Sequence, residues 1–294
     1  LAPLLPMNGI VGSVTTAAAA ELGIAEGIPV TTGTIDSITS AVGSGALTAR
    51  DGSVIVGTTS VLVSHIDEHR SDLGVGILAV PSPLVGMYYV MAENGVGGRA
   101  LDWAMRLFGY GGDYAAAIAD AEVIDPGAEG VCFLPWLLGS IAPQPNDDVR
   151  AAFAGLSLHH DRRHMVRAVM EGVAVNLGWL RPAVESFVGH DFAHVRFGGG
   201  GAQSDLWAQM LADALDRPVH QLDEPRATNA RGAAFLAFAT LGKLSIDDVP
   251  GLLRTRAVRQ PDPANRDSMD GALRRLTELH RALVGLADRA IRVD

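Results

Sequence analysis

The sequence is poor in cysteine and in positive charge, and it has no long apolar run. Its single cysteine, Cys132, excludes an intramolecular disulfide and is typical of a reducing cytoplasm. Acidic residues outnumber basic ones by 33 to 23, and the net charge of −10 argues against nucleic acid or an anionic membrane as the main partner. No apolar run reaches the ~20 residues of a membrane helix, and no signal peptide is visible. We therefore expect a cytoplasmic protein with no nucleic-acid and no membrane partner.

Two common nucleotide-binding motifs are also missing, although one glycine-rich stretch is present. Four glycines, Gly198–Gly201, follow a strand-like run at 193–197 and precede an amphipathic helix at 205–215. Their spacing fits neither the dinucleotide fingerprint nor the lysine-bearing P-loop. Glycine at a strand-to-helix turn lets the backbone approach a flat or anionic ligand beside free N–H groups. A nucleotide or phosphate site is favoured over the alternative, a flexible tight turn.

The chain is long enough for one large domain or two modest ones. It has 294 residues, of which 48% are hydrophobic, so material for a core is ample. Predicted strands alternate with predicted helices, which indicates an α/β protein. The sequence begins at Leu1 in a loop-like stretch, and we expect an N-terminal part to be missing or supplied separately.

An aspartate and a polar hairpin tip are further candidates for function. Asp36 lies between a predicted strand at 28–32 and a helix at 37–42, and by spacing alone an N-cap role is favoured for it. The strands predicted at 53–56 and 61–64 form a hairpin whose tip is Gly57–Ser60. Such a tip can wrap phosphate oxygens, but without context an ordinary polar hairpin is the preferred interpretation.

Other elements follow from periodicity. A strand is predicted at 87–91, a glycine-rich loop at 92–98 and a helix at 99–108, so a second glycine turn opens onto a helix start. Core helices are predicted at 162–180 and 229–241, a loop at 249–265, and a last amphipathic helix from about residue 266.

The histidines do not predict a metal site. His65 and His69 fall in a charged loop, and a metal site there would need a helix and further ligands. His159, His160 and His164 lack ligand partners at suitable spacing other than Asp161, so a solvated loop is expected.

Several motifs together resemble one family. The segment Ala151–Leu156, seven residues, and then His164–Glu171 is similar to the C-terminal signature of the FGGY carbohydrate kinases. The order of the other motifs agrees with that family. Gly33–Asp36 resembles the segment with the catalytic aspartate, and Gly57–Ser60 resembles a phosphate loop. Gly199–Ala202 resembles the adenosine motif, and Glu224–Ala234 resembles the block that closes the nucleotide site. Gly139–Ile141 and Val149–Ala151 depart from the common pattern of the family.

The resemblance implies an actin/hexokinase-type (ribonuclease H-like) ATPase domain, with a mixed sheet flanked by helices. It reverses the interpretation of Asp36, which becomes the general base for a sugar hydroxyl that attacks ATP. It implies that Mg²⁺ bridges the phosphates largely through water, with no metal site built from protein ligands. The residues implied to bind the nucleotide are Gly57, Thr58, Thr59, Gly97, Gly98, Gly200, Gly201, Ala202 and Asn229, with an N-cap role open for Asn229.

The resemblance also bears on domains and substrate. Residues 1–40 resemble the end of an N-terminal sugar-binding domain, and 41–294 the C-terminal nucleotide-binding domain. The segments around Asp36 and Glu93–Gly95 look most like xylulose-type pentulose kinases; gluconate, glycerol and ribulose kinases remain open, and a homodimer is common in the family. A contrasting hypothesis is a non-catalytic nucleotide-binding fragment or regulatory domain. A sugar-sensing repressor is disfavoured because no DNA-binding helix pair or basic patch is visible.

Overall fold

The computed structural model describes residues 5–290 of the chain, with side chains to Leu286. The strands are β1 (Ile10–Ser13), β2 (Pro29–Thr31), β3 (Gly52–Val56), β4 (Thr59–Ile66), β5 (Ser71–Asp72), β6 (Ile77–Pro81), β7 (Tyr88–Val96), β8 (Cys132–Leu134), β9 (Ala152–Ala154), β10 (Val195–Gly198), β11 (Val219–Leu222) and β12 (Thr255–Arg259). The α-helices are α1 (Thr16–Leu22), α2 (Asp36–Ser44), α3 (Gly98–Leu107), α4 (Tyr114–Glu122), α5 (Arg162–Val188), α6 (Asp205–Leu215), α7 (Thr228–Thr240), α8 (Val249–Leu252) and α9 (Arg266–Ala290). Short 3₁₀ turns include η1 (Ala128–Gly130), η2 (Gly200–Gln203) and η3 (Pro225–Ala227).

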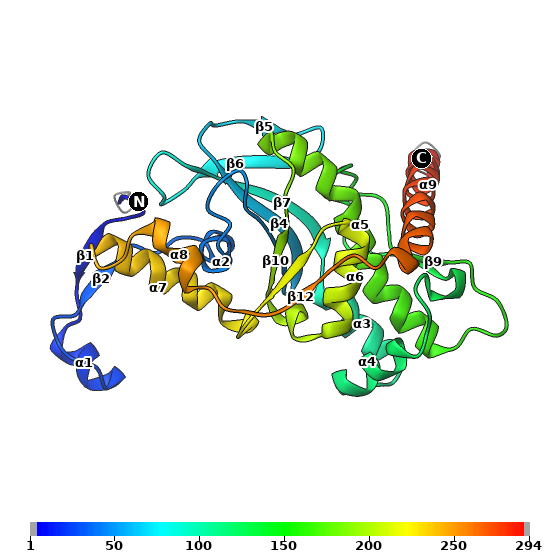
Figure 1. The fold of residues 1–294 in the computed structure, drawn as a ribbon, viewed down its shortest axis with the longest axis horizontal. Coiled ribbons are helices and arrows are strands. Elements are labelled where there is room, and N and C mark those ends of the chain that lie inside the picture. The colour runs from blue at the N-terminus through cyan, green and yellow to red at the C-terminus, as the bar shows by residue number, and fades with distance from the viewer. Residues whose placement is uncertain (1–4, 291–294) are drawn as a thin grey trace.

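A mixed eight-stranded sheet forms the centre of the molecule. Its strand order is β12-β11-β10-β3-β4-β7-β6-β5, in which β10 runs parallel to both neighbours and the other pairs are antiparallel. Helices α2 and α7 lie on one side of the sheet and α5 and α6 on the other (Figure 1). This confirms the predicted α/β class and the mixed sheet flanked by helices.

Both faces of the sheet are buried, and the side chains of alternate β4 residues point to opposite faces. Leu62 and Ile66 join the main core with α5, whereas Val61 and Val63 pack with Ile38 of α2. Because side chains of a strand point alternately to opposite faces, a run apolar at nearly every position is what a sheet covered on both sides requires. The sequence Val61–Ile66 therefore forms an interior strand.

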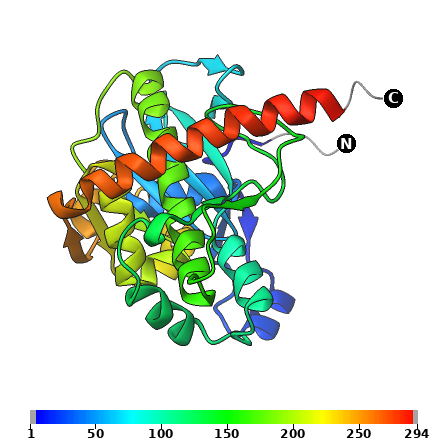
Figure 2. The ribbon, with the colours of Figure 1, turned by 90° about the vertical axis from the view of Figure 1, so that its right-hand side faces the viewer.

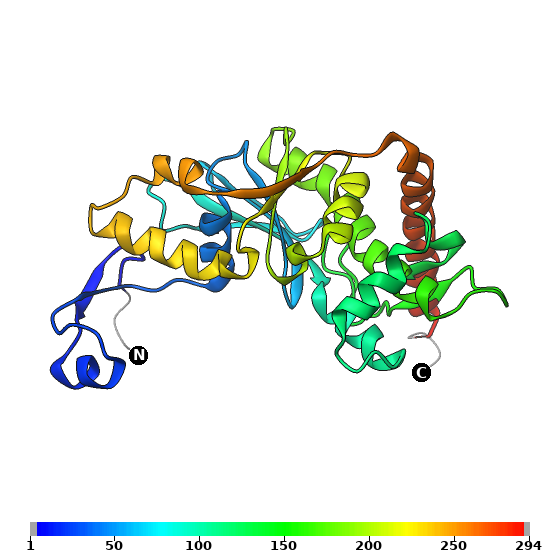
Figure 3. The ribbon, with the colours of Figure 1, turned by 60° about the horizontal axis from the view of Figure 1, so that its bottom comes forward.

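The N-terminal residues form a separate arm. Strands β1 and β2 pair antiparallel around α1, which has no buried residue, and the arm projects away from the sheet (Figure 3). Its exposed apolar side chains are Ile10, Val11, Leu22, Ile24, Ile28 and Val30. In the described part of the chain, no helix is both long and apolar enough to cross a membrane.

The last helix covers the opposite side of the molecule. Helix α9 packs on α5 through Met269 and Leu276, and Figure 2 shows it as the outermost helix on that side. Leu276 is fully buried although the helix is polar overall, so a single apolar stripe attaches α9.

Several expectations about local structure are wrong. Strand β7 continues to Val96 through the predicted loop at 92–98, and β12 forms inside the predicted loop at 249–265. Helix α5 extends eight residues past Leu180 to Val188, with Pro182 inside it, because Val184 and Val188 bury in the main core.

Two histidines also differ from expectation. His65 lies within β4 and is fully buried, where its ring contacts the Ala46 carbonyl oxygen at 2.5 Å and the Ser82 Oγ at 2.9 Å. His164 is buried in the first turn of α5, where its Nδ1 accepts the N–H of the cap residue Asp161 at 3.1 Å. The polar ring of each histidine led to the prediction of a loop. In the folded chain both rings have hydrogen-bond partners, which makes their burial possible.

Candidate functional site

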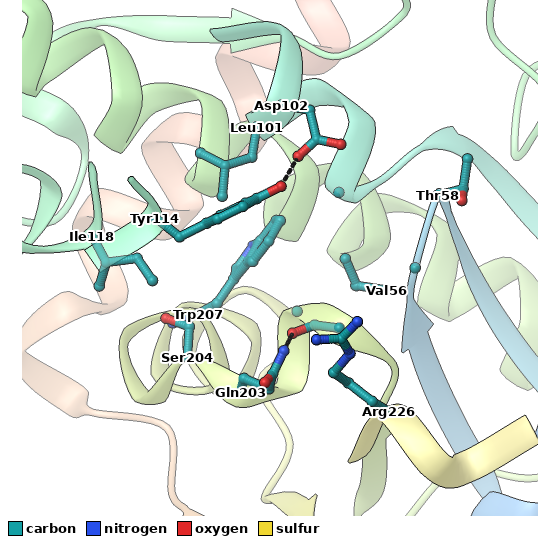
Figure 4. A pocket seen from close by; sticks show the side chains of 14 residues that line it. Val56, Thr58, Leu101, Asp102, Tyr114, Ile118, Gln203, Ser204, Trp207 and Arg226 are labelled. Carbon is teal, nitrogen blue, oxygen red and sulfur yellow. Dashed lines mark hydrogen bonds between the residues drawn. The ribbon is translucent and has the colours of Figure 1, made fainter. Parts of the chain in front are cut away.

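A cavity of about 550 Å³ opens where the β3–β4 hairpin tip faces the glycine corner that precedes α6 (Figure 4). Its size falls within the range of ordinary ligand pockets. The lining residues are Val56, Gly57, Thr58, Gly98, Leu101, Asp102, Tyr114, Ile118, Gly200, Gly201, Gln203, Ser204, Trp207 and Arg226. The structure therefore brings together Gly57, Thr58, Gly98, Gly200 and Gly201, which are far apart in the sequence.

The hairpin tip is held against the start of α3 by main-chain hydrogen bonds. The N–H of Gly97 donates to the Thr58 carbonyl oxygen at 3.1 Å, and the N–H of Gly98 to that of Gly57 at 2.8 Å. A Cβ on Gly97 would lie 2.5 Å from the Thr59 carbonyl oxygen, so this position requires glycine for close approach. These two N–H groups are therefore engaged within the chain, and they fix the tip that carries Thr58.

The glycines of the corner have different roles. Gly199 has a φ of +84°, and a Cβ there would lie 2.6 Å from the Val56 carbonyl oxygen. A Cβ on Gly201 would lie 2.8 Å from Val56 Cγ1. A Cβ on Gly200 meets no described atom within 4 Å beyond its chain neighbours, so Gly200 faces the open cavity. Close packing against Val56 thus explains Gly199 and Gly201, and Gly200 is the position with space left for a ligand.

The cavity has an apolar end and a polar end. Leu101, Ile118 and Trp207 line one end, and the indole N–H of Trp207 donates to the Met170 carbonyl oxygen at 3.1 Å. Thr58 and Arg226 lie at the other end, across from these side chains (Figure 4). An elongated ligand with a flat apolar head and a polar tail fits this arrangement.

A tyrosine and an aspartate lie at the same end of the cavity as Leu101 and Ile118 (Figure 4). The Tyr114 hydroxyl donates to Asp102 Oδ1, and this bond together with burial raises the pKa of Tyr114. The bond joins α4 to α3 beside the cavity.

Asp36 lies elsewhere, at the start of α2. Ile35 is the N-cap residue, with no side-chain cap bond, and Asp36 is the first residue of the helix with an exposed side chain. The N-cap interpretation of Asp36 is therefore wrong. The carboxylate lies near the positive end of the α2 dipole.

Asn229 of α7 contacts this same turn. The Thr39 hydroxyl donates to Asn229 Oδ1 at 2.8 Å, and Asn229 Nδ2 donates to the Asp36 carbonyl oxygen at 3.4 Å. The N-cap residue of α7 is Ala227, so the N-cap alternative for Asn229 is also wrong. The structure thus joins Asn229 to the helix that carries Asp36.

Five predicted site residues are outside the set that lines the cavity within residues 5–290: Asp36, Thr59, Gly97, Ala202 and Asn229. Thr59 begins β4 with an exposed side chain. Ala202 is fully buried beneath the corner, and its carbonyl oxygen accepts from Gln221 Nε2 at 2.7 Å.

Sequence reasoning missed the cavity residues Leu101, Asp102, Tyr114, Trp207 and Arg226. Arg226 lies within the segment Glu224–Ala234 that resembled a nucleotide-site block, which was a usable signal. The others come from amphipathic helices, and periodicity does not distinguish a cavity wall from ordinary core.

A histidine cluster lies away from the cavity. Ligand atoms of Glu129, His159 and His160 lie within 4.8 Å of one another. The Ser157 N–H donates to His160 Nδ1 at 2.9 Å, which places the proton of the neutral ring on Nε2. A metal ligand needs a free lone pair, so this bond opposes coordination through His160. The absence of a metal site stays a prediction.

Comparison with known proteins gives consistent matches. A sequence model described as the FGGY family of carbohydrate kinases, C-terminal domain, matches residues 52–241. A xylulose kinase of Bacillus subtilis (strain 168) is 30% identical over 237 residues, covering 80% of this chain and 47% of the relative. A gluconokinase of Bacillus licheniformis is 30% identical over 267 residues, covering 85% of this chain and 50% of the relative. The chain thus spans about half the length of the curated relatives it matches.

Solved structures agree on the fold. The crystal structure of xylulose kinase from Rhodospirillum rubrum matches with a TM-score of 0.80 and 30% identity, covering 97% of this chain and 58% of that one. Plasmodium falciparum glycerol kinase, at 23% identity and a TM-score of 0.73, shares the fold. The expected actin/hexokinase-type architecture is therefore confirmed.

Proposed function

Because this chain belongs to the FGGY family of carbohydrate kinases, we propose that it binds ATP and, within a complete enzyme, phosphorylates a hydroxyl group of a sugar or polyol. The observation that carries the proposal is the cavity between the hairpin tip and the glycine corner. It has room for a nucleotide, an apolar end for a base and small residues where a phosphate chain would pass.

The nucleotide orientation follows from the two ends of the cavity. The adenine lies among Leu101, Ile118 and Trp207, because a flat apolar ring gains most from those surfaces. The triphosphate passes Gly200 and reaches the Thr58 hydroxyl and the main chain around Gly57. Mg²⁺ would bind chiefly to the phosphates and to water, which suits a cavity with the one carboxylate of Asp102 among its lining residues.

Asp36 is the proposed general base. Its exposed carboxylate can accept the proton of a sugar hydroxyl as that oxygen attacks the γ-phosphate and ADP leaves. Helix α2 packs against α7, and α7 follows directly on η3 at the cavity rim. Thr59 and Gly97 then act by holding the tip, Ala202 by holding the corner, and Asn229 by holding the first turn of α2. The residues that border the phosphates are Gly57, Thr58, Gly98, Gly200 and Gly201.

We propose that the arm belongs to a sugar-binding domain distinct from the nucleotide-binding domain. Its apolar side chains are exposed, and burial begins at Ile38 within α2. A boundary at residue 40 would fall inside α2, so we place it just before Asp36. We also propose a cytoplasmic location and a homodimer, as expected from the sequence.

The proposed sugar is a ketopentose of the xylulose type, because more of the matched relatives are named xylulose kinase than gluconokinase. Gluconate is the second candidate, since a gluconokinase reaches the same 30% identity. A contrasting proposal is that the chain binds nucleotide without catalysing transfer.

Two measurements test these proposals. Isothermal titration of the purified chain with ATP and Mg²⁺ should give a saturable one-site signal, and sugar-dependent ADP release is then assayed with xylulose and with gluconate. Binding without ADP release would favour the non-catalytic alternative. No binding of ATP or ADP at millimolar concentration would overturn the nucleotide site itself.

A further inference from the structure

Arg226 is the cation at the polar end of the cavity. It belongs to η3, its side chain is exposed, and it lines the cavity together with Thr58 and Gly200. Figure 4 shows its guanidinium directed into the cavity, between Val56 and Gln203. The guanidinium therefore lies where a ligand entering the cavity would meet it.

This arginine has no protein partner among the side chains that the structure describes. No carboxylate lies within 4.0 Å of its guanidinium in residues 5–286, and it donates no hydrogen bond there. Two other arginines of the chain are engaged: Arg231 donates to the Asp223 carbonyl oxygen at 2.8 Å, and Arg259 pairs with Asp205 at 2.9 Å. An uncompensated cation facing a cavity, in a chain of net charge −10, is available to an anion.

The backbone of Arg226 is fixed to the glycine corner. The N–H of Gly199 donates to the Pro225 carbonyl oxygen at 2.9 Å, and the Thr228 hydroxyl donates to the same oxygen at 2.7 Å. Pro225 is buried, so the turn cannot shift without disturbing the core. This anchoring fixes the main chain from which the Arg226 side chain extends at the rim of the cavity.

We propose that Arg226 binds phosphate oxygens of the nucleotide and is a phosphate-binding residue of this chain. The inference rests on the proposed nucleotide site and adds a residue to it. A planar guanidinium can donate two parallel N–H bonds to a phosphate, which a lysine cannot. The base is not its partner, because the apolar end lies across the cavity from Arg226.

The test compares ligands with and without phosphate. Affinities of the full chain for ADP with Mg²⁺ and for adenosine are measured by calorimetry and by ligand-observed NMR, respectively. Arg226→Ala should weaken ADP binding roughly ten- to a hundredfold and change adenosine binding less than about twofold. Arg226→Lys should recover part of the ADP affinity. Arg274→Ala, at an exposed position on α9, is the matched control and should bind both ligands as the unmodified chain does.

The outcomes separate this inference from the proposed function. If the unmodified chain binds ADP and Arg226→Ala binds it equally well, Arg226 is not a phosphate residue, although the nucleotide site stands. Equal losses for ADP and adenosine would mean contact with the nucleoside and would also overturn the inference. If the unmodified chain binds neither ligand, the nucleotide site and the inference fail together. Urea unfolding of each variant shows that the folded state is retained.

Discussion

Gly43 of α2 and Gly232 of α7 pack directly against each other's helix backbone. A Cβ on Gly43 would overlap the Thr228 carbonyl oxygen, and a Cβ on Gly232 would overlap that of Thr39. Backbone atoms cannot move aside as a flexible side chain can, so the two helices cross with no space for a methyl group. The contact joins the helix that starts at Asp36 to the one that follows η3, and so connects the two parts of the proposed active site.

Gly43→Ala and Gly232→Ala should each destabilise the chain. Relieving the overlap requires α2 and α7 to separate, and overpacking of this kind costs about 1–3 kcal/mol or more. Urea unfolding should show a lower midpoint with an unchanged slope. Gly285→Ala in α9 is the control: its Cβ meets no described atom within 4 Å, and alanine should stabilise the helix by about 0.5–1 kcal/mol. An unchanged midpoint in the α2 and α7 variants would contradict this close approach.

Gly200→Ala should separate binding from stability. The added methyl group points into open space, so the free energy of unfolding should change by less than about 0.5 kcal/mol. The same methyl group would occupy room that we assign to the nucleotide, and ATP affinity should fall at least about tenfold. Calorimetry and urea unfolding measure the two effects.

The adjacent Gly199→Ala provides the contrast for that experiment. It places a side chain at a φ of +84° and against the Val56 carbonyl oxygen, so it should lower the free energy of unfolding by about 1 kcal/mol or more. Full ATP affinity in a folded Gly200→Ala variant would show that no nucleotide passes this residue.

Local sequence predicted the elements well where periodicity was strong, as in α6, whose bounds at 205 and 215 agree with the prediction. It failed where tertiary contacts decided the outcome. β12 forms because it pairs with β11, and His65 is buried because a carbonyl oxygen and a hydroxyl from other segments meet its ring. The glycines of the site were recognisable as motifs, but only the folded chain shows that Gly97 approaches Thr59 whereas Gly200 faces the cavity.

His65 should make stability depend on pH. Burial lowers the pKa of its imidazole to about 4, with the Ala46 carbonyl and Asp51 opposing the shift, whereas in the unfolded chain the pKa is near its ordinary 6.5. Between these values the unfolded chain binds a proton that the folded chain does not. The free energy of unfolding therefore falls as pH drops from about 6.5 toward 4, by up to about 3 kcal/mol from this group.

Urea unfolding from pH 7 to 4 measures this dependence, and the fall should be smaller in His65→Gln. His69→Gln, at an exposed position four residues along, should keep the steep dependence of the unmodified chain. NMR titration of the His65 ring gives a direct check, and an ordinary pKa there would refute the explanation.

Asp36→Asn should abolish most of the sugar-dependent turnover proposed for this protein. The amide cannot accept the proton of the attacking hydroxyl, and loss of a general base costs about 10²–10⁴-fold in rate. ATP affinity should be unchanged, because the Asp36 side chain lies outside the cavity lining. The turn should also be kept, since Asn229 binds the main-chain carbonyl oxygen of residue 36, which the substitution leaves in place. Asp67→Asn, at another exposed position, is the control and should turn over normally. Turnover of Asp36→Asn within about tenfold of the unmodified enzyme would assign the base to another residue.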